Sequence, residues 1–269
     1  MDSRTGKKIR MGRIFNGMSG KTLILAYSHG VVLGPEPGMA SLEEIRKVAA
    51  QLGDADALLV SPGMVAHLED SFIGRGRPGF MVHLDYQSYS RSILPYPVGS
   101  TTGLAEVEDL AAAGADGLMT YLYVGYEDPE REKEEVARNA RLARACEKWG
   151  IVLMIEALSA RSKTNPEDVT DARLLAMCCR IASDIGADIV KCQYPGSAEA
   201  IATVASGCLS PLVLAGGAKT ADPEEPFRMA REAIGAGAAG LVYGRNIFEA
   251  KDPKAAIRRY REIIHGTWA

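Results

Sequence analysis

The chain has 269 residues, of which 47% are hydrophobic and 24% are charged, and its formal net charge is −3. This length and balance are typical of a globular protein with a large core. The charge argues against nucleic acid or an anionic membrane as the main partner. No apolar stretch approaches the roughly 18 residues of a transmembrane helix, so we expect no membrane span.

Five cysteines are present, and none forms a Cys-x-x-Cys pair. In a chain of this size we interpret them as reduced thiols of a cytoplasmic protein. The first eleven residues are basic and polar, and they lack the apolar centre of a secretory signal. We therefore expect an N-terminal extension over residues 1–20, lying against the body of the fold, and one domain over residues 21–269.

Eight apolar runs predict strands, and the segments between them have helical patterns. The strands are expected at 22–27, 57–60, 80–84, 117–124, 151–156, 188–192, 212–215 and 240–243. The main helices are expected at 41–52, 129–149, 170–185, 198–206, 223–235 and 253–264. Eight such units in about 250 residues predict a single-domain α/β protein with a (β/α)₈, or TIM, barrel.

An internal repeat supports this order of elements. Each copy has a glycine after a helix, a small turn and an apolar strand. The clearest copies begin at Gly53, Gly114, Gly186 and Gly237. A doubly wound open sheet is the alternative, but it usually carries Gly-x-Gly-x-x-Gly after its first strand, where this chain has Ser28-His29-Gly30-Val31-Val32-Leu33.

Lys191 and Glu156 are the two candidate catalytic residues. Burial favours the neutral amine of a lysine, which can attack a carbonyl and form a Schiff base. Most lysines after a strand are instead solvated surface residues. Glu156 ends the preceding strand, so the two side chains are expected to lie close together. Glu156 is either part of a buried ion pair with Lys191 or Arg161, or a general acid/base for a lysine imine.

Two glycine loops follow the seventh and eighth strands, where many barrels of this fold bind phosphate. The first contains Gly216, Gly217 and Lys219, and the second contains Gly244 and Arg245. Glycine lets backbone N–H groups approach phosphate oxygens, and a cation adds a charge-assisted hydrogen bond. A lone Gly-Gly is usually only a turn, but two such loops with a cation each predict a phosphate site.

Other polar residues near strand ends have two interpretations each. His29 and His83 are core or rim histidines, or they face the site. Tyr121 and Tyr123 project to one face, where they pack in a layer or bind a sugar hydroxyl. Asp85 is a second carboxylate of the site or caps the next loop. No metal site is indicated, because the chain has neither an Asp/His ligand triad nor a His-Glu-x-x-His helix.

Several motifs, in order, resemble those of the class I, Schiff-base aldolases of the archaeal-type fructose-bisphosphate aldolase group, also called the DeoC/FbaB-like aldolases. They are Ala26-Tyr27-Ser28-His29-Gly30, Gly186-Ala187-Asp188-Ile189-Val190-Lys191, Ala215-Gly216-Gly217-Ala218-Lys219-Thr220 and residues 237–248. The resemblance covers residues from about 20 to 250. It implies that Lys191 is the Schiff-base lysine and that Gly217, Gly244 and Arg245 help bind the substrate phosphate.

Two positions depart from that family. The family commonly has Asp-His-Gly where this chain has Ser28-His29-Gly30, and it tends to have a tyrosine turn where this chain has Ile155-Glu156-Ala157. A glutamate there is similar to the tagatose-bisphosphate aldolases, in which Glu and Lys work as a pair. By this resemblance Glu156 and Lys191 are the catalytic pair, and Ser28, His29 or Asp85 takes the place of the aspartate. As the acid/base of this pair, Glu156 is expected either to take the proton from the C4 hydroxyl or to shuttle protons in imine formation.

The resemblance implies a metal-independent class I aldolase without an organic cofactor, which cleaves or forms a C–C bond in a phosphorylated ketose or related keto-sugar. We expect a small phosphorylated sugar as its partner and a homo-oligomer as its assembly. A transaldolase-like or thiolase-like synthase of the same family is one alternative. A non-catalytic phosphosugar-binding barrel is another.

Overall fold

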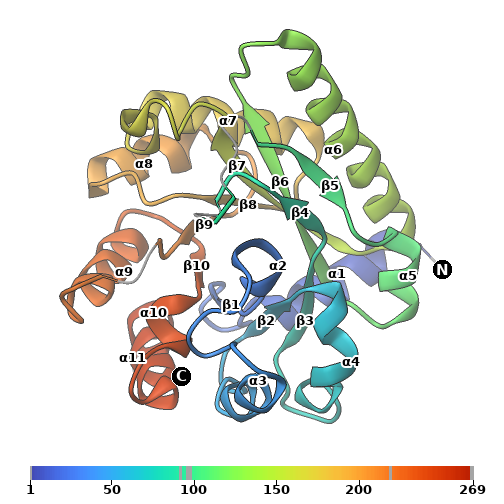
Figure 1. Cartoon of the computed structure of the whole chain (residues 1–269), viewed down its shortest axis with the longest axis vertical. Coiled ribbons are helices and arrows are strands. Elements are labelled where there is room, and N and C mark those ends of the chain that lie inside the picture. Colours follow the sequence, from blue (N-terminus) through green and yellow to red (C-terminus); the bar gives the residue numbers. More distant parts are fainter. Residues whose placement is uncertain (1, 91–92, 95–98, 218–219, 267–269) are drawn as a thin grey trace.

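The computed structural model describes residues 2–90, 93–94, 99–217 and 220–266. Eight parallel strands close into a barrel in the order β1-β10-β9-β8-β7-β6-β3-β2 (Figure 1). They are β1 (Thr22–Ala26), β2 (Ala57–Val60), β3 (Gly79–His83), β6 (Gly117–Val124), β7 (Val152–Ser159), β8 (Ile189–Cys192), β9 (Leu212–Ala215) and β10 (Gly240–Tyr243). The predicted single-domain (β/α)₈ barrel is confirmed, with a strand at each predicted place.

Helices surround the barrel and occupy every segment in which one was predicted (Figure 1). The predicted ones are α3 (Leu42–Ala49), α6 (Pro129–Trp149), α7 (Ala172–Ile185), α8 (Ala198–Gly207), α9 (Glu225–Gly235) and α11 (Pro253–His265). Shorter ones are α2 (Gly30–Leu33), α4 (Val65–Leu68), α5 (Val107–Ala112) and α10 (Arg245–Phe248). Among the described residues, no helix combines the length and the apolar character needed to cross a bilayer.

The longest of these helices, α6, shows how local sequence fixes the boundaries. The Asp128 carboxylate accepts a hydrogen bond from the backbone N–H of Glu130, and Pro129 occupies the first turn, where a missing N–H costs nothing. Gly150 ends the helix in the left-handed conformation, with φ 66°. Both ends are thus encoded by residues that continue the helix poorly, which is why its predicted range was accurate.

Strand β7 is longer than predicted. It pairs with β6 from Val152 to Ser159, whereas its predicted end was Glu156. The eight residues of β6 are all buried and extend the ladder beyond the rest of the barrel. Glu156 therefore lies within a strand, opposite Lys191 on β8 in the backbone register.

An antiparallel hairpin follows β3 and was not predicted. It consists of β4 (Asp85–Gln87) and β5 (Thr101–Gly103). Its strands are only three residues long, and short polar strands of this kind carry almost no periodic signal. In Figure 1 the hairpin lies over the β6 side of the barrel.

The aspartates of the sequence repeat have one structural role in common. Asp56, Asp116 and Asp188 each precede a strand and accept a hydrogen bond from a backbone N–H of a neighbouring strand. The donor–acceptor distances are 2.7, 2.9 and 2.8 Å. These N–H groups lie just before the first residue pair of the strand ladder and have no strand partner there. The three aspartates therefore satisfy backbone N–H groups at the N-terminal end of the barrel.

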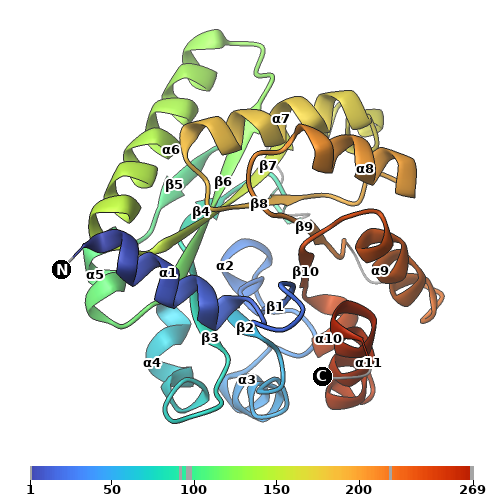
Figure 2. The ribbon, with the colours of Figure 1, turned by 180° about the vertical axis from the view of Figure 1, so that it is seen from behind.

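Basic side chains cover these aspartates. Helix α1 (Ser3–Ile14) supplies Lys7, which lies 3.0 Å from Asp188, and Arg13, which lies 3.0 Å from Asp116. Its last residue, Ile14, is fully buried in the apolar cluster inside the barrel. Figure 2 shows α1 lying across this end of the barrel. The predicted N-terminal extension therefore contains a helix that closes the barrel floor, and the cavity opens at the opposite end.

We expect Asp56→Asn to lower the free energy of unfolding by about 2–4 kcal/mol, because Arg261 and His265, at 2.7 and 2.9 Å, lose the charge that they face. Burial raises the pKa of Asp56, but hydrogen bonds from His265, the Leu23 amide and Arg261 hold it below its ordinary 3.8. Its contribution is thus complete above pH 3.8 and is lost as the pH falls through the folded-state value.

Urea unfolding of the parent protein and the variant at several pH values measures this effect. The difference between them should be constant near neutral pH and shrink in acid. Asp54→Asn, at an exposed position two residues away, is the matched control and should change little. Equal stability of Asp56→Asn and the parent protein at pH 7 would contradict the role given to this carboxylate.

Candidate active site

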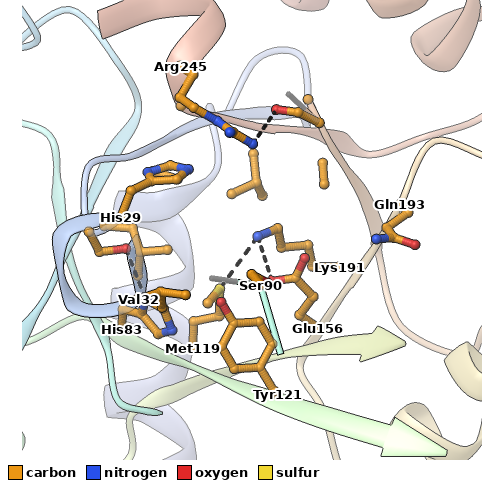
Figure 3. A pocket seen from close by; sticks show the side chains of 18 of the residues that line it. His29, Val32, His83, Ser90, Met119, Tyr121, Glu156, Lys191, Gln193 and Arg245 are labelled. Carbon is orange, nitrogen blue, oxygen red and sulfur yellow. Dashed lines mark hydrogen bonds and ion pairs between the residues drawn. The ribbon is translucent and has the colours of Figure 1, made fainter. Parts of the chain in front are cut away.

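A cavity of about 400 Å³ opens at the C-terminal ends of the strands (Figure 3). The barrel interior below it is filled by buried apolar side chains such as Ile24, Met81 and Val213. The cavity is lined by nine of the twelve predicted site residues: Ser28, His29, Tyr121, Glu156, Lys191, Gly216, Gly217, Gly244 and Arg245. The fold thus brings together residues that are up to 217 positions apart in the sequence, from 28 to 245.

Lys191 and Glu156 form a direct pair in this cavity. Nζ of Lys191 lies 2.7 Å from Oε2 of Glu156, and both side chains are at least nine-tenths buried. The amine also lies 3.8 Å from the Met119 sulfur. Arg161, the other predicted partner of Glu156, instead pairs with Asp168 at 3.4 Å. A carboxylate at this distance can take a proton from the amine or return one, which is the requirement for acid/base work at an imine.

The two glycine loops meet above this pair. Arg245 extends from the loop after β10, and its Nη2 lies 3.4 Å from the carbonyl oxygen of Gly217 in the loop after β9. The buried Nε of Arg245 has no hydrogen-bond partner. In the view of Figure 3, Arg245 and Tyr121 lie at opposite ends, with Lys191 and Glu156 between them. A cation and two glycine loops here suit an anionic group of a ligand; Lys219, predicted for the same site, lies outside the described residues.

Gly244 cannot carry a side chain in this arrangement. A Cβ atom there would lie 2.4 Å from Cε1 of His29 and 2.8 Å from the carbonyl oxygen of Ala26. His29 in turn packs edge-on against Phe248, with ring centroids 5.4 Å apart. Gly244 follows β10 and His29 follows β1, so the missing side chain lets these two segments pack directly against each other.

Two histidines of the cavity are held neutral. Burial, together with the nearby charges of Arg245 and Lys191, lowers the pKa of His29 to about 3. Burial and, to a lesser extent, Lys191 and His29 lower the pKa of His83 to about 3 as well. Nδ1 of His83 lies 2.9 Å from the hydroxyl of Ser28. Both rings are thus neutral hydrogen-bonding groups at physiological pH.

Tyr121 faces the cavity, whereas Tyr123 does not line it. Burial, and then the charge of Glu156, raises the pKa of Tyr121 well above its ordinary value, so its phenol stays protonated. The ring of Tyr123 stacks on Tyr89 at a centroid distance of 3.9 Å. Of the two interpretations of Tyr123, the structure therefore favours packing.

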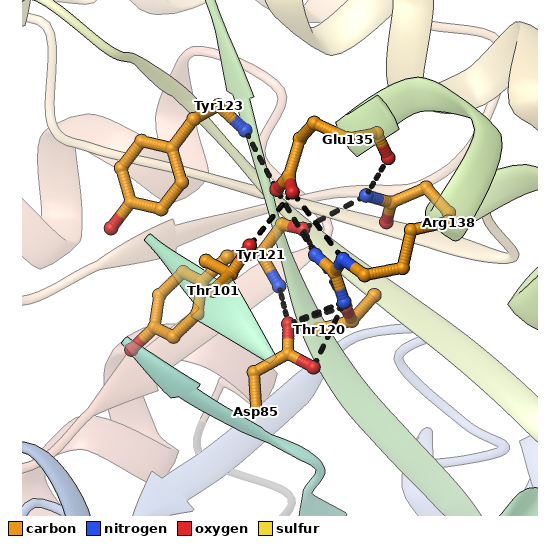
Figure 4. Close-up of polar contacts among 8 residues, drawn as sticks. Asp85, Thr101, Thr120, Tyr121, Tyr123, Glu135 and Arg138 are labelled. Carbon is orange, nitrogen blue, oxygen red and sulfur yellow. Dashed lines mark hydrogen bonds and ion pairs between the residues drawn. The ribbon is translucent and has the colours of Figure 1, made fainter. Parts of the chain in front are cut away.

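Asp85 also lies outside the cavity lining. Its fully buried carboxylate lies 3.0 Å from Arg138 and accepts hydrogen bonds from Thr120 and the Tyr121 amide (Figure 4). The same arginine pairs with Glu135, which binds Thr101 of the hairpin. Asp85 is thus held away from the cavity by α6, and the arrangement supports its interpretation as a structural group rather than a substrate contact.

Several lining residues were not predicted. Gln87 and Ser90 come from the hairpin and the residues after it, and could not be placed because the hairpin itself was missed. Gln193 and Tyr194 lie two and three residues after Lys191, so their closeness to a candidate lysine in the sequence was the available signal. His83 was noted at a strand end without an assigned role. Among the described residues there is no cluster of three or more His, Cys, Asp or Glu side chains that suits a metal ion.

Comparison with known proteins supports one family. The family model "DeoC/LacD family aldolase" matches residues 22–250. The chain is 34% identical to an uncharacterised aldolase of Saccharolobus solfataricus, over 97% of this chain and 94% of that protein. It is 29% identical to a 2-amino-3,7-dideoxy-D-threo-hept-6-ulosonate synthase of Halobacterium salinarum, over 97% and 92%. A structure of a Schiff-base-forming fructose-1,6-bisphosphate aldolase is similar, with a TM-score of 0.80 and 25% identity over 96% and 99%.

We expect Gly244→Ala to lower the free energy of unfolding by about 1–3 kcal/mol, because the added methyl group clashes with both the His29 ring and the Ala26 carbonyl oxygen of β1. Gly63→Ala is the control, since a Cβ at Gly63 meets no atom within 4 Å. Urea unfolding measures both variants. A Gly244→Ala protein as stable as Gly63→Ala would contradict the close packing of Gly244 against His29 and Ala26.

Proposed function

The chain belongs to the DeoC/LacD family of aldolases, and from this premise we propose that it is a class I aldolase acting through a Schiff base on Lys191. The proposed reaction cleaves or forms a C–C bond in a phosphorylated ketose or related keto-sugar. The observation that carries the proposal is the buried contact of 2.7 Å between Lys191 and Glu156 on the cavity wall. A buried pair of this kind, open to a ligand cavity, suits proton transfer at a lysine imine.

Formation of the Schiff base is the first part of the proposed mechanism. Glu156 accepts a proton from the Lys191 ammonium, and the neutral amine attacks the ketone carbon of the substrate. The resulting carbinolamine loses its hydroxyl as water, for which Glu156 returns the proton, and an iminium remains. Water is excluded from most of this pair, which strengthens the electrostatic interaction between the carboxylate and the positive nitrogen.

Cleavage of the C–C bond follows. The iminium nitrogen draws the electron pair of the bond, the hydroxyl on the departing carbon loses its proton, and an aldehyde leaves. The enamine that remains is protonated at carbon and hydrolysed, which releases a ketone and regenerates Lys191. The reverse sequence forms the bond, and the name of the Halobacterium salinarum relative, a synthase, is consistent with that direction.

Binding of the substrate phosphate places the ketone. Arg245 and the backbone around Gly216, Gly217 and Gly244 form the anion-binding side of the cavity in this proposal. Anchoring one end of the substrate fixes the reacting carbon near Lys191 and so reduces the entropic cost of the reaction. Lys219 lies in the same loop and remains a predicted contact. Dihydroxyacetone phosphate, the smallest ketone of this class, is a suitable probe.

We expect dihydroxyacetone phosphate and borohydride to add one reduced adduct to the parent protein, detected by intact mass. Lys191→Met should form none, because the nucleophile is gone. Glu156→Gln should form it about 10²–10³-fold more slowly, because proton transfer is lost. Lys163→Met, at an exposed position after β7, is the matched control and should react normally. Binding of the phosphate probe without any adduct would instead favour a non-catalytic phosphosugar-binding barrel.

We expect Arg245→Met to raise the half-saturating concentration of dihydroxyacetone phosphate in this reaction about 10–100-fold, which corresponds to the loss of one charge-assisted hydrogen bond. The concentration of unphosphorylated dihydroxyacetone needed should change little, because it makes no such bond. Arg173→Met, an exposed arginine of α7, is the control. Equal effects on both ketones would contradict the assignment of Arg245 to the phosphate.

A further inference from the structure

His83 presents an unused polar atom at the cavity. It ends β3, lines the cavity and is only 2% exposed. Its Nδ1 contacts the Ser28 hydroxyl at 2.9 Å, whereas its Nε2 is buried and has no hydrogen-bond partner. Buried polar atoms are nearly always paired, and an exception at a ligand cavity indicates a partner that arrives with the ligand.

The groups around His83 indicate which role its Nε2 atom can take towards a ligand. Its ring packs edge-on against Tyr121, with centroids 5.2 Å apart, and it lies in the fields of Lys191 and His29. Glu156 is engaged with Lys191, and the phenol of Tyr121 stays protonated. Asp85, two residues along the chain, is held by Arg138. Among the described lining residues, His83 is therefore a neutral acceptor that is separate from the Lys191–Glu156 pair.

On the basis of the proposed aldolase function, we propose that Nε2 of His83 takes the proton from the substrate hydroxyl as the C–C bond breaks, and that Ser28 positions the ring. Ser28 accepts a hydrogen bond from the Nδ1–H group, which leaves the lone pair of Nε2 free. Because Nε2 is buried, the hydroxyl reaches it when the bound substrate displaces the side chains that cover it.

The charges of this step balance within the cavity. The O–H proton moves to Nε2, the electron pair of the O–H bond forms the aldehyde C=O, and the pair of the C–C bond forms the enamine C=C. The π pair of the iminium becomes the nitrogen lone pair. One positive charge thus disappears at Lys191 as one appears at His83. The lysine charge that opposes protonation of the imidazole is removed in the same step, so proton transfer and bond cleavage favour each other.

Determining the tautomer of His83 in the free protein tests whether Nδ1 donates to Ser28 and Nε2 carries the lone pair. The chain has four histidines, so ¹⁵N-histidine NMR is feasible, with His83→Gln assigning the signal. We expect a neutral ring with Nδ1 protonated and Nε2 unprotonated above about pH 5. Ser28→Ala should lose this preference, and Ser28→Thr should keep it because it retains the hydroxyl. A ring with the proton on Nε2, or a charged ring at pH 7, would overturn the inference.

Kinetics separate the two steps. Formation of the borohydride adduct with dihydroxyacetone phosphate needs no C–C chemistry, so His83→Gln and His83→Asn should form it at nearly the rate of the parent protein. Their rate of C–C bond formation between dihydroxyacetone phosphate and D-glyceraldehyde 3-phosphate, D-glyceraldehyde or glycolaldehyde should fall about 10²–10⁴-fold. Ser28→Ala should lose part of this rate and Ser28→Thr should restore it. His67→Gln, at an exposed position, is the control.

The outcomes distinguish this inference from the proposed function. No adduct in the parent protein contradicts the Schiff-base mechanism itself. A normal adduct with unimpaired C–C bond formation in His83→Gln contradicts only the role of His83. If His83→Gln loses adduct formation and C–C bond formation equally, His83 acts in imine formation or in the structure of the site, and the inference is overturned. The inference is also overturned if the parent protein forms the adduct but couples none of the aldehydes, because there is then no C–C bond step in which His83 can act.

Discussion

The register between β7 and β8 is the constraint on which the site depends. It sets Glu156 opposite Lys191 in neighbouring parallel strands, so that their side chains emerge together and meet at 2.7 Å. A shift of one residue in either strand would turn one side chain towards the surrounding helices. The extension of β7 along β6 to Ser159 holds Glu156 within a ladder rather than at a free strand end. The buried charge pair is therefore positioned by backbone hydrogen bonds, which are far more rigid than a loop.

The N-terminal end of the barrel is closed, so the Lys191–Glu156 pair is reached from the cavity at the C-terminal end. Asp56, Asp116 and Asp188 complete the backbone hydrogen bonding at the N-terminal end, and α1 covers that end with Lys7 and Arg13. Apolar side chains fill the interior up to Met119, which contacts the Lys191 amine. Stability is thus concentrated at one end of the barrel and the chemistry of the proposed mechanism at the other.

The sequence was most informative where one physical signal sufficed. Apolar runs located all eight barrel strands, and polar residues at the strand ends located most of the cavity. It was least informative where long-range contacts decide. Asp85 looked like a site carboxylate, but Arg138, 53 positions away, binds it outside the cavity. The hairpin that contributes Gln87 has three-residue strands without periodicity, and the pairing of His83 with Ser28, 55 positions apart, appears only in the folded barrel.

The most direct test of this account is a crystal structure of the protein after borohydride reduction with dihydroxyacetone phosphate. The account predicts continuous density from Nζ of Lys191 to the central carbon of the probe, beside Glu156. It also predicts the phosphate between Arg245 and the loop that contains Gly217. Density on another lysine, or a phosphate at the opposite end of the cavity with Lys191 unmodified, would contradict the proposed chemistry and the direction in which the substrate lies.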